Sequence, residues 1–524
     1  MMKLRSLMLS ISLALAVCQA QNGKFAPDLN FQEIRQTMES RERTQNFGAP
    51  ASTDETRIKV IIQYDSKSGR SARTRNARAV GRNRSSLDLI GADVVEVTAA
   101  ELELLRNDPE VAYVSPDREL EGTLDIAMNV INYIPANDYA NANLKPKGYG
   151  VAVAVLDSGI NSAHKNLQNW NNTSVSRVLY SQSFIDASTA DLQGHGTHVA
   201  GLIASTGNIA HFDNSQKLGL YAPSMDGNLV SLKVLDANGK SSDSVVISAI
   251  NQAIALKGTY NIRVINLSLG RAIKESYKTD PLCQAVEKAW KAGIVVVVAA
   301  GNFGRDNSAG TKGYGTITSP ANDPYVITVG AVNDHQYYLR DATLNVATYS
   351  SKGPSAIDHI IKPDLVAPGN RLISLQAPSA TLELQYPGNR PLVSDITTNL
   401  TSAVSAEFFQ LSGTSMAAPL VSGTAAFLIS NDGTLTPDQV KSRMMKTAWR
   451  GFNKSVDVYA DITKATYHVT HDIFTIGAGL LDASAAYFNT DRPTGSAASP
   501  MAVFNSTTKI AAINYNSTGA ANVV

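Results

Sequence analysis

The sequence predicts an α/β protein in which a mainly parallel sheet is flanked by helices on both faces, preceded by a small α+β domain. Apolar segments such as VAVAVL, VINLSL and IVVVVAA lack polar alternation, which is typical of strands buried on both faces. Stretches with helical periodicity separate them, including residues 242–256 and 281–291. Strands that alternate with helices indicate parallel pairing through helical crossovers. We expect this unit to span residues 125–486.

The preceding block, residues 57–124, is predicted to be a separate α+β domain. RIKVIIQY and GADVVEVT are strand candidates, and EVAYVSPD is a third. Residues 98–109 have the pattern of a capped helix, because Glu101 follows Thr98 at the spacing of a capping box.

Length and composition describe a globular protein with room for more than one domain. The chain has 524 residues, of which 44% are hydrophobic, and a net charge of +1. That charge gives no global attraction to nucleic acid or acidic membranes. We expect a leader or linker over residues 21–56 and a low-complexity tail or incomplete module over residues 487–524. The basic run from Lys67 to Arg84 lacks interleaved aromatic residues, so a solvated helix or loop is favoured over a nucleic-acid-binding arm.

The first twenty residues have the layout of a secretory signal peptide. Lys3 and Arg5 precede an apolar stretch, residues 7–17, and a small residue stands at the expected cleavage site. An alternative makes Cys18 a site of lipid attachment, which the preceding Val17 fits poorly. No later segment is apolar enough to span a membrane. We therefore expect a secreted protein, extracellular or periplasmic, without stable membrane association unless Cys18 is lipidated.

If Cys18 leaves with the signal peptide, Cys283 has no partner for an internal disulfide. Cys283, Val286 and Trp290 share one helical face, which indicates a buried apolar thiol rather than a catalytic one.

A single small serine stands at the start of the helical pattern LSGTSMAAPLVSG, residues 411–423. Helix starts favour Ser and Thr because their hydroxyls cap unpaired backbone N–H groups, so Thr414 or Ser415 can be read as a cap. The functional interpretation is that the electropositive start of a helix mounts Ser415 as a nucleophile and stabilises an oxyanion.

Three other residues supply matching chemistry. Asp157 follows a buried strand, where catalytic groups of parallel sheets lie, although an aspartate there can also be a turn former. His195 lies in GHGTHVAGLIA, and Asn302 ends the most hydrophobic strand. Acyl transfer needs a hydroxyl, an imidazole, a carboxylate and an oxyanion donor. His195 and His198 also suggest a metal pair, but no cysteine or obvious third ligand accompanies them, so no metal site is expected.

The ordered motifs DSG (157–159), HGTH (195–198) and GTSMAAP (413–419) resemble those of the subtilisin-like serine peptidases, the subtilases. The resemblance covers residues 125–486, and the block before it is similar to the inhibitory propeptide of that family. It implies four roles: Ser415 as nucleophile, His195 as general base and then acid, Asp157 as its orienting partner, and Asn302 as side-chain oxyanion donor.

The resemblance also implies where substrate binds. An extended peptide would lie along one edge segment, and a second segment would form the far wall of the specificity pocket. The edge segment is Leu267, Ser268, Leu269 and Gly270, and the wall segment is Ser319, Pro320 and Ala321.

Two features depart from the family pattern. Many members hold calcium through an aspartate where this chain has Asn166, and the loop at residues 205–219 is longer here. No cofactor is therefore expected to be required; calcium is possible, but its usual site is not matched. The segment between Gly369 and Ser415 is also longer than in compact members and is a candidate flap.

The sequence thus predicts a secreted, monomeric serine endopeptidase, made as a self-processing zymogen, with polypeptide substrates and its own propeptide as inhibitor and chaperone. One alternative is an α/β-hydrolase esterase, which orders its triad Ser, acid, His. Its candidates after Ser415 are Asp457 or Asp461 with His468 or His471. It leaves the two earlier motifs unexplained. The other alternative is a catalytically inactive binding protein of the subtilase fold.

Overall fold

The computed structural model describes residue 24 and residues 57–64, 80–87, 92–116, 127–128, 130–133, 147–169, 172–207, 221–333, 343–396, 403–460, 463–508 and 510–515. The chain divides into two compact units, Met1–Leu120 and Glu121–Val524. The expected signal peptide and almost all of the expected leader lie outside the described residues. Within the described part of the chain, no helix is long and apolar enough to cross a membrane.

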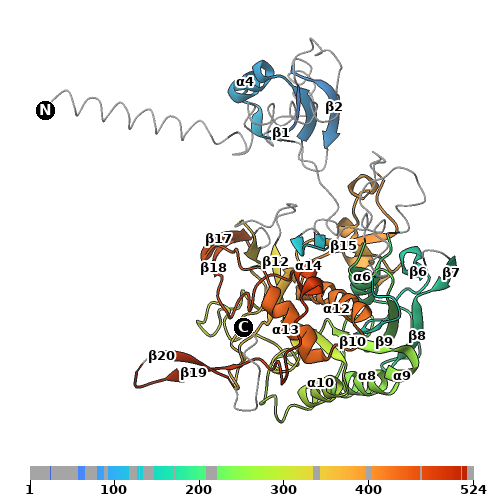
Figure 1. Ribbon diagram of the computed structural model, residues 1–524. Coiled ribbons are helices and arrows are strands. Elements are labelled where there is room, and N and C mark those ends of the chain that lie inside the picture. Colours follow the sequence, from blue (N-terminus) through green and yellow to red (C-terminus); the bar gives the residue numbers. More distant parts are fainter. Residues whose placement is uncertain are drawn as a thin grey trace. The chain divides into compact units, whose positions relative to one another are not determined.

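The N-terminal unit contains a four-stranded antiparallel sheet in the order β2-β3-β1-β4, packed with one helix (Figure 1). Its elements are β1 (Ile58–Tyr64), β2 (Arg82–Leu87), β3 (Ala92–Val97), α4 (Ala99–Asn107) and β4 (Val111–Pro116). Thr98 caps α4, and the predicted capping box with Glu101 is present. Val60, Val95 and Val114 are fully buried, so this unit has its own hydrophobic core.

The sequence did not reveal β2, which begins at Arg82 inside the basic run that was expected to be a helix or loop. The strand pairs with β3, and Arg82 itself is exposed. Tertiary pairing has overridden weak local preference here, because RNRSSL has little apolar alternation. Residues 65–79 of the run lie outside the described residues.

The C-terminal unit is built on an eight-stranded, mainly parallel sheet with the path β13-β12-β11-β10-β5-β9-β8, to which β14 adds beside β12. All of its pairings are parallel except β12 with β13. Its strands are β5 (Ala152–Asp157), β8 (Val178–Ser183), β9 (Asn228–Lys233), β10 (Ile262–Leu267), β11 (Val295–Ala299), β12 (Ile327–Asn333), β13 (Asn345–Val346) and β14 (Leu365–Pro368). Strands β5, β11 and β14 are buried along their whole length, and for β5 and β11 the unbroken apolar pattern predicted this.

Helices cover both sides of this sheet (Figure 1). Helices α6 and α12 pack on each other and on the sheet, while α8 and α10 form a second packed pair. The helices are α6 (His195–Ala204), α8 (Asp243–Ala255), α9 (Lys257–Tyr260), α10 (Pro281–Lys291), α12 (Thr414–Asn431), α13 (Pro437–Thr447) and α14 (Ala483–Phe488). The predicted helices at 242–256 and 281–291 are confirmed within one residue at each end. Cys283 is buried inside α10, and burial raises the pKa of its thiol.

The C-terminal unit also contains four two-stranded antiparallel pairs outside the large sheet in its described part. They are β6 (Gln168–Asn169) with β7 (Asn172–Ser176), β15 (Leu372–Leu375) with β16 (Phe408–Leu411), β17 (Ser455–Ala460) with β18 (Ala465–Thr470), and β19 (Met501–Asn505) with β20 (Ile510–Asn514). The segment between β15 and β16 contains α11 (Thr381–Gln385).

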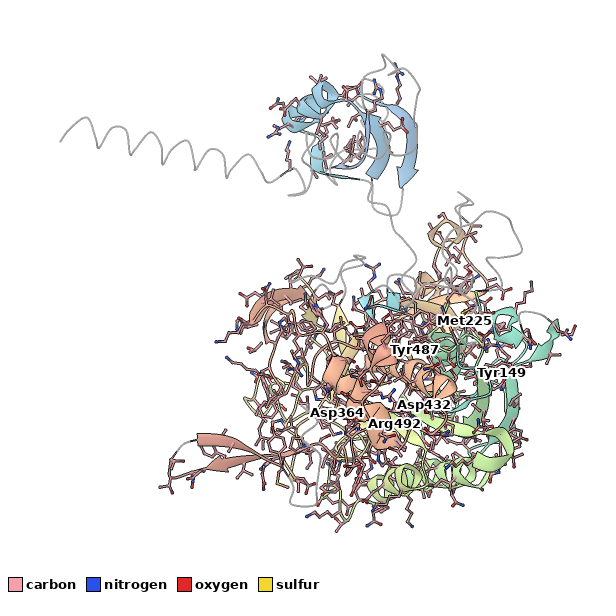
Figure 2. The ribbon with its side chains drawn as sticks, viewed as in Figure 1. Tyr149, Met225, Asp364, Asp432, Tyr487 and Arg492 are labelled. Carbon is pink, nitrogen blue, oxygen red and sulfur yellow. The ribbon has the colours of Figure 1, made fainter. Side chains whose placement is uncertain are left out.

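The stretch after Tyr487, expected to be a low-complexity tail or incomplete module, has defined structure in its described part. Strands β19 and β20 form a hairpin that extends from the body of the unit (Figure 1). The preceding residues pack on the body, where Arg492 pairs with Asp432 (Figure 2) and Ser499 is 2% exposed. The sequence concealed this because small and polar residues make these contacts without any periodic pattern.

Candidate active site

Asp157 and His195 meet at the carboxyl edge of the sheet. Asp157 is the last residue of β5. Strands β9 and β10, which both come later in the chain, lie on opposite sides of β5 in the sheet. Such a position is a topological switch point, where crevices open in α/β sheets. His195 is the first residue of α6, and its Nδ1 lies 2.8 Å from Asp157 Oδ1. The Asp157 side chain is 0% exposed and that of His195 16%, so the carboxylate orients a ring that solvent can reach.

A second carboxylate, Asp191, stands behind this pair and was not identified from the sequence. Its Oδ1 accepts the Ser158 hydroxyl at 2.8 Å and the Gly194 N–H at 2.7 Å. Its Oδ2 accepts the Thr197 N–H at 2.8 Å and the Thr197 hydroxyl at 2.6 Å. Asp191 therefore ties together the residue after Asp157 and both flanks of His195. Its place one helical turn before the histidine was the only sequence signal for this role.

The electrostatics of His195 follow from these two carboxylates. Burial by itself lowers the pKa of an imidazole because it disfavours the charged form. The charge and hydrogen bond of Asp157, with a further contribution from the charge of Asp191, outweigh burial and hold the pKa of His195 above its ordinary 6.5. The imidazolium form is thereby stabilised, as a group that must accept a proton during a reaction requires.

Ser415 lies in the first turn of α12, but it is not the helix cap. The cap position is Gly413, which has no side chain to donate or accept. Pro419 has no N–H, so the carbonyl of Ser415, four residues earlier, has no intrahelical donor. The Ser268 hydroxyl donates to that carbonyl at 2.9 Å, and the Ser415 hydroxyl donates to the Ser268 carbonyl at 3.1 Å. The nucleophile candidate is thus joined to the segment after β10.

Among the hydrogen bonds of the described residues, the Ser415 hydroxyl donates to the Ser268 carbonyl and makes no hydrogen bond to His195. Catalytic hydrogen bonds are often long or misaligned without substrate, so this arrangement does not separate the two residues functionally.

Asn302 follows β11 and is exposed at the same edge of the sheet. Its Oδ1 accepts the backbone N–H of Thr414 at 2.9 Å and the Thr414 hydroxyl at 3.1 Å. These bonds fix which end of the amide is the oxygen, and the Nδ2 of Asn302 lies 3.3 Å from the Cβ position of Gly413. Thr414, which the sequence suggested only as a cap, is therefore the residue that orients Asn302.

The two predicted substrate segments lie next to each other in the structure. Arg271, directly after Gly270, forms a two-way backbone bridge with Ser319 at 2.8 and 3.0 Å. Ser319, Pro320 and Ala321 are all buried. Thr318, which the sequence did not single out, lies between the glycines that follow β10 and β11. A Cβ atom at Gly270 would approach its Oγ1 to 2.6 Å, and one at Gly301 its Cγ2 to 2.8 Å.

His198 makes its hydrogen bond to β15 and not to His195. It is fully buried, its Nε2 lies 3.1 Å from the Leu372 carbonyl oxygen, and burial lowers its pKa to about 3. The ring is therefore neutral and helps to hold β15. No group of three or more His, Cys, Asp or Glu side chains in the described ranges is placed to hold a metal ion.

The calcium position that Asn166 brought into question contains a cationic side chain. Asn166 is buried, and its Nδ2 donates to the Ser205 hydroxyl at 3.0 Å. Its carbonyl oxygen, together with those of Gln168, Ala204 and Gly227, accepts from the guanidinium of Arg177, which lies in the turn between β7 and β8. Burial lowers the pKa of Arg177 to about 10, which leaves it charged at neutral pH. These carbonyls do not fit a calcium ion, because the ion would have to share them with the positive charge of the buried guanidinium.

The candidate flap borders the loop that leads into His195. In α11, the N–H groups of Thr381 and Leu382 donate to the carbonyls of Leu192 and Gln193 at 2.9 and 3.0 Å. Leu384, in the same short helix, is 70% exposed. The flap function itself stays a prediction, and residues 397–402 of this segment lie outside the described part.

The rival acid and base of the esterase hypothesis also form a pair. His468 Nδ1 lies 2.7 Å from Asp457 Oδ1 across the β17–β18 hairpin, where the two residues face each other in register. Both side chains are more than half exposed. Exposure leaves such a pair screened by water and does not fix the ring, in contrast to the buried carboxylate of Asp157.

Comparisons with known proteins identify similar sequences and structures. Serine protease AprX of Bacillus subtilis (strain 168) is 32% identical over 389 residues, which cover 72% of this chain and 78% of AprX. Subtilisin amylosacchariticus of Bacillus subtilis subsp. amylosacchariticus is 32% identical over 374 residues, which cover 70% of this chain and 78% of that protein. The solved structure of sphericase aligns with a TM-score of 0.45 and 26% identity over 66% of this chain and 96% of sphericase. Residues 148–479 match the model of the subtilase family, Peptidase_S8. The chain therefore belongs to the subtilase family and is a serine endopeptidase that acts on polypeptides.

Proposed function

We propose that Ser415, His195 and Asp157 form the catalytic triad of this peptidase, with Asn302 as oxyanion donor. The observation that carries the proposal is the 2.8 Å contact between His195 and the buried carboxylate of Asp157. This contact lies at the edge of the sheet where Ser415 and Asn302 also lie. The roles proposed for this triad and for the asparagine donor are those that the corresponding groups have in subtilisin.

In the proposed reaction, the Ser415 hydroxyl leaves Ser268 and attacks the scissile carbonyl carbon. His195 Nε2 accepts the hydroxyl proton, and Asp157 stabilises the imidazolium that forms. The negative charge on the former carbonyl oxygen is met by the Asn302 Nδ2 and the backbone N–H of Ser415. His195 then gives its proton to the leaving amine, and water repeats the sequence to release the acyl group from Ser415.

The peptide would lie along Leu267–Gly270, because the ends of that segment are tied to Ser415 on one side and to Ser319 on the other. A backbone that adds to an existing edge gains affinity from main-chain hydrogen bonds while pockets select side chains. Thr318 is buried, and neither Gly270 nor Gly301 places a Cβ atom against it, so we assign Thr318 to the floor of the pocket.

The secreted, self-processing zymogen is part of the same proposal. The signal-like pattern of the first twenty residues supports export, and the separate core of the N-terminal unit supports an inhibitory propeptide that folds by itself. We further propose a monomer that requires no calcium at the Asn166 position, because Arg177 supplies the positive charge there.

Labelling with a small serine-reactive phosphonate tests the triad. We expect labelling of Ser415 in the natural protein and none in Ser415→Ala. His195→Ala should lower the labelling rate by at least about 10³-fold, because it removes the general base. His468→Ala is the matched control, since that residue also pairs with an aspartate; it should label at the natural rate. The reverse pattern would support the esterase-type triad and contradict this proposal.

A further inference from the structure

The segment Asp491–Pro500, here called the C-terminal clamp, runs beside α13 and ends among buried charges. Arg443 Nε donates to the Asp491 carbonyl at 2.9 Å, and the Arg492 guanidinium donates to the Thr434 hydroxyl at 2.8 Å. Further along, the N–H of Ala497 donates to Asp438 at 2.6 Å. These contacts fix the path of the clamp at several separate points on the body.

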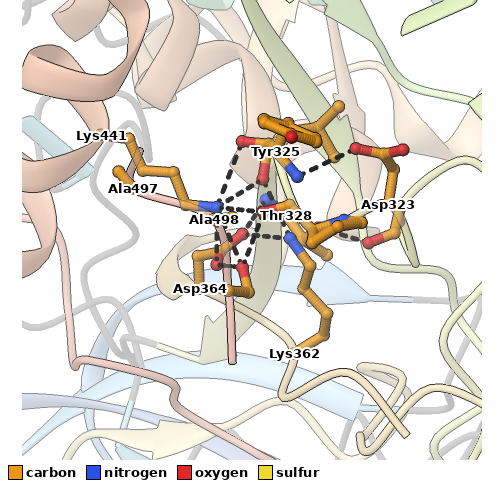
Figure 3. Close-up of polar contacts among 12 residues, drawn as sticks. Asp323, Tyr325, Thr328, Lys362, Asp364, Lys441, Ala497 and Ala498 are labelled. Atoms are coloured by element: carbon orange, nitrogen blue, oxygen red, sulfur yellow. Dashed lines mark hydrogen bonds and ion pairs between the residues drawn. The ribbon is translucent and has the colours of Figure 1, made fainter. Parts of the chain in front are cut away.

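At its end, the clamp contributes the Ser499 hydroxyl to a set of oxygens around the ammonium of Lys441. Figure 3 shows Lys441 with its contacts beside Asp364 and Tyr325. Lys441 Nζ donates to the Ser499 hydroxyl oxygen at 2.9 Å and lies 3.1 Å from Asp364 Oδ1. It also donates to the carbonyls of Pro324, Tyr325 and Val326 at 2.9, 3.2 and 3.0 Å. Lys441 and Asp364 are at most 1% exposed, so each partner compensates charge that water cannot reach.

A second ammonium completes the cluster. Lys362 Nζ donates to Asp364 Oδ2 at 2.7 Å and to the Val326 carbonyl at 2.9 Å. Ser499 donates to Asp364 Oδ1 at 2.5 Å, and its N–H donates to the Pro324 carbonyl at 2.8 Å. Two buried lysines share one adjacent carboxylate, and burial lowers the pKa of Lys362 to about 7. The neutral oxygen acceptors around both ammonium groups therefore carry much of the compensation when the groups are charged.

The carbonyls gripped by this cluster belong to the loop that directly continues Ser319–Ala321. Pro324 lies three residues after Ala321, and the Thr328 hydroxyl donates to the Ala321 carbonyl at 2.6 Å. The N–H of Thr328 in turn donates to Asp364 Oδ2 at 2.7 Å. The loop is therefore held from Ala321 to Thr328 by groups that all converge on Asp364, Lys441 and Ser499.

We propose that Ser499 of the C-terminal clamp is a positioning residue for the substrate pocket, because it locks the loop whose first residues, Ser319–Ala321, form the pocket wall. The inference rests on the proposed function, which makes that wall part of the site. It extends the functional peptidase beyond residue 486 to at least Pro500. Ser499 touches no substrate; it acts through Lys441 and the Pro324–Val326 carbonyls.

The test compares Ser499→Ala with Ser496→Ala, the same change three residues earlier on the same segment. The Ser496 hydroxyl donates to Asp438 at 3.3 Å and accepts from the Ala498 N–H at 3.2 Å, and neither contact includes Lys441 or Asp364. Full-length variants are assayed with two peptides that differ only in a large or a small side chain before the scissile bond. We expect Ser499→Ala to change the ratio of their kcat/KM values about threefold to tenfold, the value of roughly one hydrogen bond. Ser496→Ala should keep the natural ratio.

A small phosphonate without such a side chain reports on the catalytic groups alone. Its labelling rate should stay within about twofold in Ser499→Ala, because a shifted wall changes selection rather than chemistry. Ser499→Thr, which keeps the hydroxyl, should restore the ratio. An unchanged ratio in Ser499→Ala, or an equal change in Ser496→Ala, would overturn the clamp. Failure of the natural protein to label would instead overturn the proposed triad, so the two failures are distinguishable.

Discussion

Replacing Arg177 with Met tests whether a side-chain cation maintains the region around Asn166. The change leaves the carbonyls of Asn166, Gln168, Ala204 and Gly227 without the guanidinium. A buried acceptor without its donor costs about 1–3 kcal/mol. Asn166 keeps a bond from the Thr206 N–H, and removal of a buried charge returns part of the loss. We estimate a net destabilisation of about 4 kcal/mol.

For a unit of roughly 400 residues, an unfolding entropy of about 2.1 cal/mol/K per residue converts this value to a fall in Tm of about 5 °C. Thermal unfolding is measured in a Ser415→Ala background so that self-digestion does not intervene. Arg263→Met is the matched control, because Arg263 donates to two carbonyls and is only partly buried; its effect should be clearly smaller. A chelator should move the Tm of the natural protein by less than about 2 °C, since no ion at this position is lost. A fall of less than 1 °C in Arg177→Met, or a much larger fall on chelation, would refute the reasoning.

Three other predictions follow from the same geometry. The kcat/KM of the natural protein should fall on acidification, with its midpoint at a pH above 6.5, because only neutral His195 acts as base and its pKa is raised. Asp191→Asn should move this midpoint to lower pH. An unchanged midpoint would show that the charge of Asp191 does not affect His195. Thr414→Val should lower kcat by about tenfold with little change in KM, because it loosens the Asn302 amide that acts mainly in the transition state; Thr424→Val, an equally buried change in the same helix, should leave kcat unaltered. The isolated 57–124 fragment should inhibit the mature enzyme competitively at micromolar concentration and lose this effect when its last six residues are trimmed; absence of inhibition by the intact fragment would contradict the propeptide assignment.

Much of the fold could be predicted from sequence because its determinants are local. Strands buried on both faces must be continuously apolar, and this made β5, β10 and β11 visible in the chain. Helix α4 was predictable from its capping box. Strand β2 was not, since its only reason to be extended is the partner strand β3.

The candidate site shows the same division. Asp157, His195 and Ser415 stand in motifs with distinctive neighbours, so each could be found from the chain alone. The roles proposed for Asp191, Thr414 and Ser499 rest on hydrogen bonds made by carboxylates and hydroxyls, which are common in loops and carry no distinctive sequence pattern. Their roles depend on which carbonyl or N–H lies opposite, and that is a property of the folded chain.

The ammonium of Lys441 is a cation that is covalently attached to the protein, unlike an ion bound from the medium. A free ion in the same ring of oxygens would be bound in proportion to its concentration in the medium, and dilution would empty the ring. The ammonium of Lys441 is tethered, so its effective concentration at the Pro324–Val326 carbonyls is set by the fold and not by the surroundings. In this chain the charge at that position is present at full occupancy, whatever ions the medium contains, for as long as α13 stays docked.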